Sequence, residues 1–132
     1  MKSATDFGRG PARGLAMTTE PNAIGWLRSD ISGARQEWDE AQIRGVAQRL
    51  GYDLRKTVVF GPLTDRPLHR LRMLVSRLSL EAVIVPSVEH FERGLVPAEL
   101  VAVADVITVT PVQTYARYAT GELPELPELT GG

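Results

Sequence analysis

The sequence contains no cysteine and only two histidines, His69 and His90, among its 132 residues. Without cysteine, the chain cannot form a disulfide scaffold, a thiolate metal site or a cysteine nucleophile. The same absence is typical of proteins in a reducing compartment, so we expect a cytoplasmic location. Because zinc-ligand spacing is missing as well, we predict neither a metal nor a cofactor.

Long apolar runs and an excess of one charge are also missing. No run approaches the roughly 18 residues that a membrane span needs, and Met1–Ala16 lacks the apolar segment of a secretory signal. Fifteen basic and sixteen acidic residues give a formal charge of -1. We therefore expect no membrane partner, and only weak contact with nucleic acid through a local patch.

Two common enzyme motifs are absent from the sequence. There is no glycine-rich phosphate loop of the form GxxxxGK[ST] and no GxSxG nucleophile elbow. The enzyme classes that depend on these motifs are excluded. The two tryptophans, Trp26 and Trp38, lie in an expected strand and an expected helix, which favours packing in a core or an interface over base stacking.

The length of the chain predicts one globular domain, since domains average about 150 residues. Composition divides it into a flexible N-terminal tail (1–21), a folded domain (22–120) and a flexible proline-rich C-terminal tail (121–132). Short apolar runs alternate with helical stripes in the domain, which predicts an α/β fold with a mostly parallel sheet between two helical layers. Expected strands are 22–28, 57–60, 82–85 and 106–109, and expected helices are 35–50, 66–78 and 97–104, with one or two helical turns in 112–120.

The helical periodicity also predicts the buried side chains and the helix ends. In the first helix the buried stripe is Trp38, Ile43, Val46, Ala47 and Leu50, and in the second it is Leu68, Leu71, Val75 and Leu78. Gly51 is expected to end the first helix in a left-handed conformation, and Thr64 or Asp65 to cap the second.

Because the carboxyl ends of parallel strands meet at one edge, the loops 29–33, 61–66 and 87–93 and the segment after Thr110 should be neighbours. These loops are rich in charged residues: Arg28, Asp30, Arg35, Asp65, Arg66, Glu89, His90, Glu92 and Arg93. Converging guanidinium groups could hold a phosphodiester through paired hydrogen bonds. Alternatively, these residues are solvated charges of the kind that loops and helix starts ordinarily carry.

Three residues of this edge are candidates for catalysis. His90 beside Glu89 could act as a general acid or base, or could be an ordinary exposed loop histidine. Ser29 and Ser32 could present a nucleophilic hydroxyl at a strand-to-helix turn, or could be turn and cap residues.

Four segments, IGWLRSDIS, RQEWDEAQIRGVAQRLGY, TDRPLHRLRMLV and AVIVPSVEHFERG, carry a family likeness when read in order. From about residue 22 to 110, the chain resembles the catalytic domain of serine site-specific recombinases, the resolvase/invertase family. The resemblance implies a sheet of about four strands in the order 2-1-3-4. It also implies transesterification, in which a serine attacks a DNA phosphodiester and clustered arginines stabilise the transition state. By this resemblance Arg28, Arg66 and Arg93 would be those arginines, Glu89 would replace the family's orienting aspartate, and His90 would replace its middle arginine.

The chain departs from the family at the nucleophile. The spacing from Arg28 places Asp30 where the serine belongs, with Ser29 one residue early and Ser32 two residues late. Aspartate cannot form a phosphoserine, and its charge opposes an approaching phosphate. The family's long dimerisation helix and helix-turn-helix have no counterpart in the sequence.

The preferred hypothesis is therefore a catalytically degenerate recombinase-like domain that acts as a binding, regulatory or self-associating module, with a second copy or another protein as partner. One alternative is an active stand-alone recombinase or nuclease domain that uses Ser29 or Ser32. A third hypothesis is a domain that binds a small anion or a nucleotide at the same edge.

Overall fold

The computed structural model describes residues 20–117. The predicted tails therefore lie outside the described residues, apart from Glu20 and Pro21. The carbonyl of Pro21 accepts a hydrogen bond of 2.8 Å from the main-chain N–H of Asp53, so the residue directly before the first strand is joined to the second strand. Within the described part, no helix is both long and apolar enough to cross a membrane.

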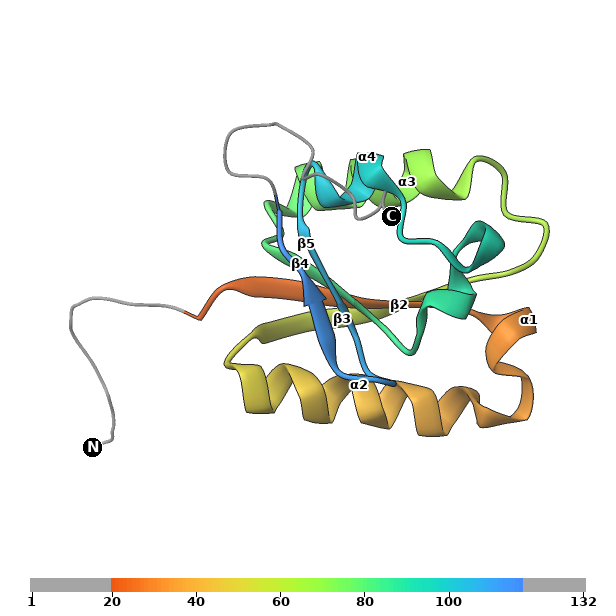
Figure 1. The fold of residues 1–132 in the computed structure, drawn as a ribbon, viewed down its shortest axis with the longest axis horizontal. Coiled ribbons are helices and arrows are strands. Elements are labelled where there is room, and N and C mark those ends of the chain that lie inside the picture. The colour runs from red at the N-terminus through yellow and green to blue at the C-terminus, as the bar shows by residue number, and fades with distance from the viewer. Residues whose placement is uncertain (1–19, 118–132) are drawn as a thin grey trace, which may run out of the picture.

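A five-stranded sheet forms the centre of the fold (Figure 1). Its strands lie in the order β3-β2-β4-β5-β6, and all neighbouring pairs are parallel except β5 and β6. The bounds are β2 (Asn22–Arg28), β3 (Asp53–Phe60), β4 (Ala82–Val85), β5 (Asp105–Thr108) and β6 (Gln113–Tyr115). The predicted α/β class and the order of the first four strands are confirmed.

The fifth strand corrects two predictions, the number of strands and the helical turns expected in 112–120, of which residues 118–120 lie outside the described part. Gln113–Tyr115 pairs antiparallel with Val106–Thr108, so its backbone groups are used by the sheet. The reversal between the strands is supported by a hydrogen bond from the Thr108 hydroxyl to the carbonyl of Pro111. Residues 113–115 are extended because β5 offers them backbone hydrogen-bond partners.

Helices cover both faces of the sheet, which gives three layers (Figure 1). The helix α2 lies on one face, and α3 and α4 lie on the other. The bounds are α1 (Ser29–Ser32), α2 (Gln36–Leu50), α3 (Pro67–Leu78) and α4 (Ala98–Val101), with 3-10 turns η1 (Gly33–Arg35), η2 (Val88–His90) and η3 (Glu92–Gly94). The predicted helix 97–104 is thus confined to a single turn.

The helix ends agree in part with the predictions. Gly51 follows α2 at φ 82, the left-handed stop that was expected. No side chain caps α3, however, and the position before Pro67 is Arg66 at φ 49. The hydroxyl of Thr64 instead accepts a hydrogen bond of 3.0 Å from the N–H of Gly61, so it stabilises the loop and not the helix.

Each face of the sheet has its own core, because successive strand residues point to opposite faces. Trp26 and Leu71 belong to the core beneath α3 and α4, and Leu27 and Ile43 to the core against α2. Of the predicted stripe in α2, Ile43, Val46 and Ala47 are buried, whereas Trp38 is 61% exposed and Leu50 is 44% exposed. The prediction was wrong for these two residues because they sit in the first and last turns of α2, towards the ends of the sheet.

The close contact between α2 and the sheet depends on a glycine. A Cβ at Gly25 would lie 2.7 Å from Cγ2 of Ile43 and 2.8 Å from Oγ1 of Thr57. Real Cβ atoms do not approach other atoms this closely, so only glycine fits at this point of β2.

Candidate functional site

The chain leaves β2 and β4 in opposite directions, although these strands are neighbours. After β2 the chain enters α2 on one face, and after β4 it continues to α4 on the other. Such a divergence opens a crevice at the carboxyl ends of the two strands, the usual place for ligands in open α/β sheets. This crevice is the candidate site.

Two hollows lie at this edge. The α3-side groove has a volume of about 700 Å³ and is lined by the end of β2 and by the loops after β3 and β4. The α2-side cavity has a volume of about 360 Å³ and is lined by the start of α2 and by residues after β4 and β5. The predicted convergence is confirmed in part: residues of 87–93 line both hollows, with residues of 61–66 in one and Ile31 and Thr110 in the other, whereas no described residue after Thr110 lines either hollow. His90 lies in the wall of both hollows.

Arg28 and Asp30 form a two-point ion pair at the end of β2. Nε and Nη2 of Arg28 donate to the two carboxylate oxygens of Asp30 over 3.2 and 2.7 Å. Both side chains are about one-third exposed, at 29% and 30%. The carboxylate of Asp30, at the position where the resemblance predicts the nucleophile, thus engages the guanidinium of Arg28.

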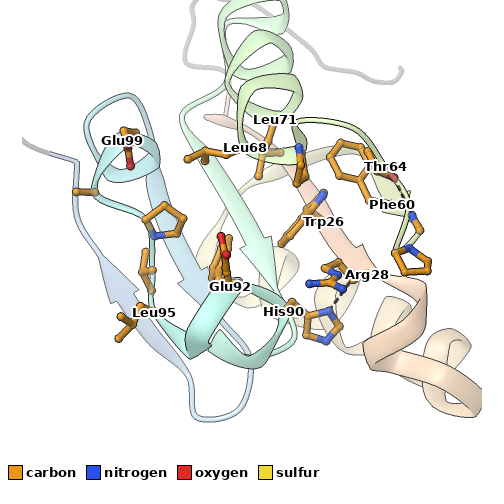
Figure 2. A pocket seen from close by; sticks show the side chains of 17 residues that line it. Trp26, Arg28, Phe60, Thr64, Leu68, Leu71, His90, Glu92, Leu95 and Glu99 are labelled. Carbon is orange, nitrogen blue, oxygen red and sulfur yellow. Dashed lines mark hydrogen bonds between the residues drawn. The ribbon is translucent and has the colours of Figure 1, made fainter.

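His90 is buried, with 3% of its surface exposed. Its Nδ1 accepts a hydrogen bond of 3.0 Å from the main-chain N–H of Arg28 (Figure 2). Burial lowers the pKa of His90, and the charge of Asp39 partly opposes this shift. Because Nδ1 is an acceptor, the neutral ring carries its hydrogen on Nε2. The interpretation of His90 as an exposed loop histidine was wrong.

The partner expected for His90 does not contact its ring. Glu89 is exposed, and no hydrogen bond joins its carboxylate to His90 among residues 20–117. The N–H of Glu89 donates 3.2 Å to the hydroxyl of Ser87, which caps the turn η2. The main chain of Arg28, not a carboxylate, therefore orients the imidazole.

Ser32 contacts a carboxylate that sequence reasoning missed. Its hydroxyl donates a hydrogen bond of 2.7 Å to Oδ2 of Asp39, and both residues are buried. Asp39 stands one turn before Ile43 and two turns before Val46, on the buried face of α2. The available signal was an acidic residue at a position of the buried stripe of α2. A prediction that considers only the apolar residues of that stripe misses Asp39.

The hydroxyl of Ser29 has no hydrogen bond among the described residues. Ser29 is half-buried, and its Oγ lies 4.0 Å from the position that a Cβ on Gly61 would take. Its side chain therefore faces the turn after β3.

The other arginines implied by the recombinase resemblance lie outside the two hollows. Arg66 and Arg93 are exposed, line neither hollow and form no ion pair within residues 20–117. Both have positive φ, 49 and 62, a region that side-chain-bearing residues rarely adopt. The structure thus brings together Arg28, Asp30 and His90, but it does not add these two arginines to the cavity walls.

Aromatic side chains form the floor of the α3-side groove (Figure 2). Trp26 stacks on Phe91 at 5.2 Å between ring centroids and meets Phe60 edge to face at 5.7 Å. Leu68 and Leu71 of α3 form one wall, and Leu95 stands on the opposite one. Trp26 is packed in the core as predicted, and its buried Nε1 has no hydrogen-bond partner in the described chain.

No protein-family model, curated protein or solved structure matches this chain. The likeness to serine recombinases therefore rests on the sequence motifs alone and stays a prediction. Residues 20–117 contain no group of three or more histidine or acidic side chains that could hold a metal ion.

Proposed function

We propose that this chain is a serine-recombinase-like domain that binds a ligand or partner at its carboxyl edge and does not transfer DNA strands. The observation that carries the proposal is the ion pair between Arg28 and Asp30, with 2.7 Å between Nη2 and Oδ2. It places negative charge where a phosphodiester would have to approach. It also engages the guanidinium nearest to that position.

The state of the serines supports the same conclusion. Phosphoryl transfer needs a hydroxyl held about 3 to 3.5 Å from the reacting atom, with unoccupied cations around the phosphate. Ser32 is buried and donates its hydrogen to Asp39. Ser29 remains the one candidate nucleophile without a hydrogen bond among the described residues, so the active-enzyme alternative depends on Ser29.

The two hollows support binding as the function. Small-molecule sites typically have volumes of about 300 to 1,000 Å³. Both the α3-side groove, at about 700 Å³, and the α2-side cavity, at about 360 Å³, fall in this range. Their position at the divergence of β2 and β4 is the one expected for a ligand in an open α/β sheet.

A DNA-cleavage assay tests the proposal. The full chain is incubated with supercoiled DNA, and covalent protein–DNA adducts are trapped by denaturation. We expect no adduct from the wild type. An adduct that disappears in Ser29→Ala or Ser32→Ala would overturn the proposal and establish the active enzyme. Ser76→Ala, on the exposed side of α3, is the matched control.

Exposed leucines support a protein as partner. Leu95 lines the α3-side groove and is 65% exposed, and Leu63, in the loop after β3, is 94% exposed. Sedimentation velocity distinguishes a second copy from another protein. A dimer that Leu95→Asp dissociates, and that Val112→Asp leaves intact, supports self-association. A monomer at all concentrations would exclude self-association.

A further inference from the structure

The α2-side cavity has two deeply buried polar side chains in its wall. Asp39 is 4% exposed and His90 is 3% exposed, yet both line this hollow. They come from different elements, Asp39 from α2 and His90 from the turn η2 after β4. Polar groups taken out of water at such a point are costly unless they find hydrogen-bond partners.

The carboxylate of Asp39 has unused capacity to accept hydrogen bonds. A carboxylate can accept about four. Oδ2 accepts one from the Ser32 hydroxyl. The nearest cation to Oδ1 is Nη2 of Arg35 at 3.7 Å, beyond hydrogen-bond range, and the Arg35 side chain is 74% exposed. Within residues 20–117, Asp39 is therefore open to further donors.

His90 offers the complementary group. Its Nδ1 is occupied by the N–H of Arg28, so Nε2 carries the hydrogen of the neutral ring. Figure 2 shows this second nitrogen pointing away from Trp26 and the α3-side groove. Nε2 has no hydrogen-bond partner in the described part of the chain. A carboxylate and an N–H donor in one cavity suit hydroxyl groups, each of which both donates and accepts.

An exposed aromatic ring completes the cavity. Trp38 lines it and is 61% exposed, unlike Trp26 in the core. Indole faces stack well on flat rings, and a purine or pyrimidine base offers such a face. Trp38 and Asp39 are adjacent in sequence, so an aromatic platform and an acceptor come from the same turn of α2.

The charge of the wall favours a neutral ligand. Asp39 and Glu89 contribute two carboxylates, and Arg35 contributes one guanidinium. Because carboxylates outnumber the cation, a phosphate would meet net repulsion. The same carboxylates attract hydroxyl hydrogens.

We propose that the α2-side cavity binds a neutral nucleoside, with the ribose diol on Asp39 and His90 and the base against Trp38. This inference rests on the proposed binding function and names its ligand class. A free sugar shares the diol but lacks the flat base, and a nucleotide shares the base and diol but adds a phosphate. These three ligands can therefore be told apart by measurement.

Binding of adenosine, guanosine, cytidine and uridine to the full chain is measured by calorimetry near neutral pH. We expect at least one nucleoside to bind. The matching 2′-deoxynucleoside and methyl β-ribofuranoside should each bind at least about tenfold more weakly, because a hydrogen bond or the stacking contact is lost. The 5′-monophosphate should also bind at least about tenfold more weakly, because the carboxylates of the cavity wall repel its phosphate. No binding of any of the four nucleosides would overturn the inference, as would equal binding of the free riboside.

Substitutions in the cavity wall test whether the nucleoside binds in the α2-side cavity. Asp39→Asn and Trp38→Ala should each weaken nucleoside binding by about tenfold. Glu37→Gln, an exposed acid of the same helix outside the cavity wall, is the matched control and should leave binding unchanged. Trp38 is exposed, so its replacement tests the site even if Asp39→Asn unfolds the chain. Nucleoside binding that survives Trp38→Ala would contradict the inference. The absence of strand transfer is tested separately, by the DNA adduct that Ser29→Ala or Ser32→Ala would abolish, so failure of the nucleoside inference and failure of that proposal are distinguishable.

Discussion

The main-chain N–H of Arg28 donates a hydrogen bond of 3.0 Å to Nδ1 of His90, 62 residues further along the chain. The bond joins the end of β2 to the turn that follows β4. It orients the imidazole between the two hollows and requires that Nδ1 carry no proton. The protonation state of one side chain is thereby linked to the geometry of the candidate site.

Stability should fall in mild acid because of His90. Burial lowers the pKa of His90 below the ordinary value of 6.5. The negative charge of Asp39 opposes this shift, the positive charge of Arg28 adds to it, and Glu89 and Asp30 oppose it more weakly. Between the lowered pKa and 6.5, the unfolded chain binds more protons than the folded chain. The free energy of unfolding therefore decreases as the pH drops through 6.5. Protonation would also remove the acceptor of the Arg28 bond.

Denaturant unfolding at about pH 7.5 and about pH 5.5 measures this effect. His90→Asn keeps a side-chain acceptor near the position of Nδ1 but does not titrate. We expect its stability to change less between the two pH values than that of the wild type. Equal losses in both proteins would show that other groups cause the pH dependence.

Replacing Ser32 by alanine should destabilise the fold by about 1 to 3 kcal/mol, because the buried carboxylate of Asp39 then loses its hydrogen bond from Oγ at 2.7 Å. Urea unfolding gives the difference. Ser76→Ala, at an exposed position of α3, should change stability by less than about 0.5 kcal/mol. A Ser32 variant as stable as that control would mean that Asp39 finds another donor.

Gly25→Ala should destabilise the protein strongly, since its Cβ would lie 2.7 Å from Ile43 and 2.8 Å from Thr57. Gly45→Ala provides the opposite case on α2. Its Cβ would meet only the end of the Arg49 side chain, at 3.8 Å. Alanine in a helix is favoured over glycine by about 1 kcal/mol, so this variant should be more stable than the wild type. Thermal unfolding of both proteins should give shifts of opposite sign.

Leu71→Ala should cost about 2 to 5 kcal/mol by leaving a cavity under α3, where Leu71 is 1% exposed. Met73→Ala, two residues away and 49% exposed, should change stability by less than about 0.5 kcal/mol. Comparable losses from the two substitutions would contradict the assignment of the buried face of α3.

Local patterns were sufficient for the framework of the fold. The apolar run Ala82–Val85 is short and fully buried, as a central parallel strand should be. Ile43, Val46 and Ala47 recur at helical spacing and are buried against the sheet. The wrong predictions of burial lie at the ends of elements. Trp38, in the first turn of α2, continues the helical pattern, but the sheet does not extend far enough to bury its side chain.

The sequence by itself determined the alternation of strands and helices, the parallel sheet and the meeting of its loops at one edge, because periodicity and turn residues act over a few neighbouring positions. The tertiary structure alone decided that His90 is buried on the main chain of Arg28, that Ser32 is bonded to Asp39, and that Gln113–Tyr115 is a strand. The environment of the buried His90 and the pairing of Gln113–Tyr115 depend on groups supplied by other strands and turns. Such groups come together only when the chain has folded.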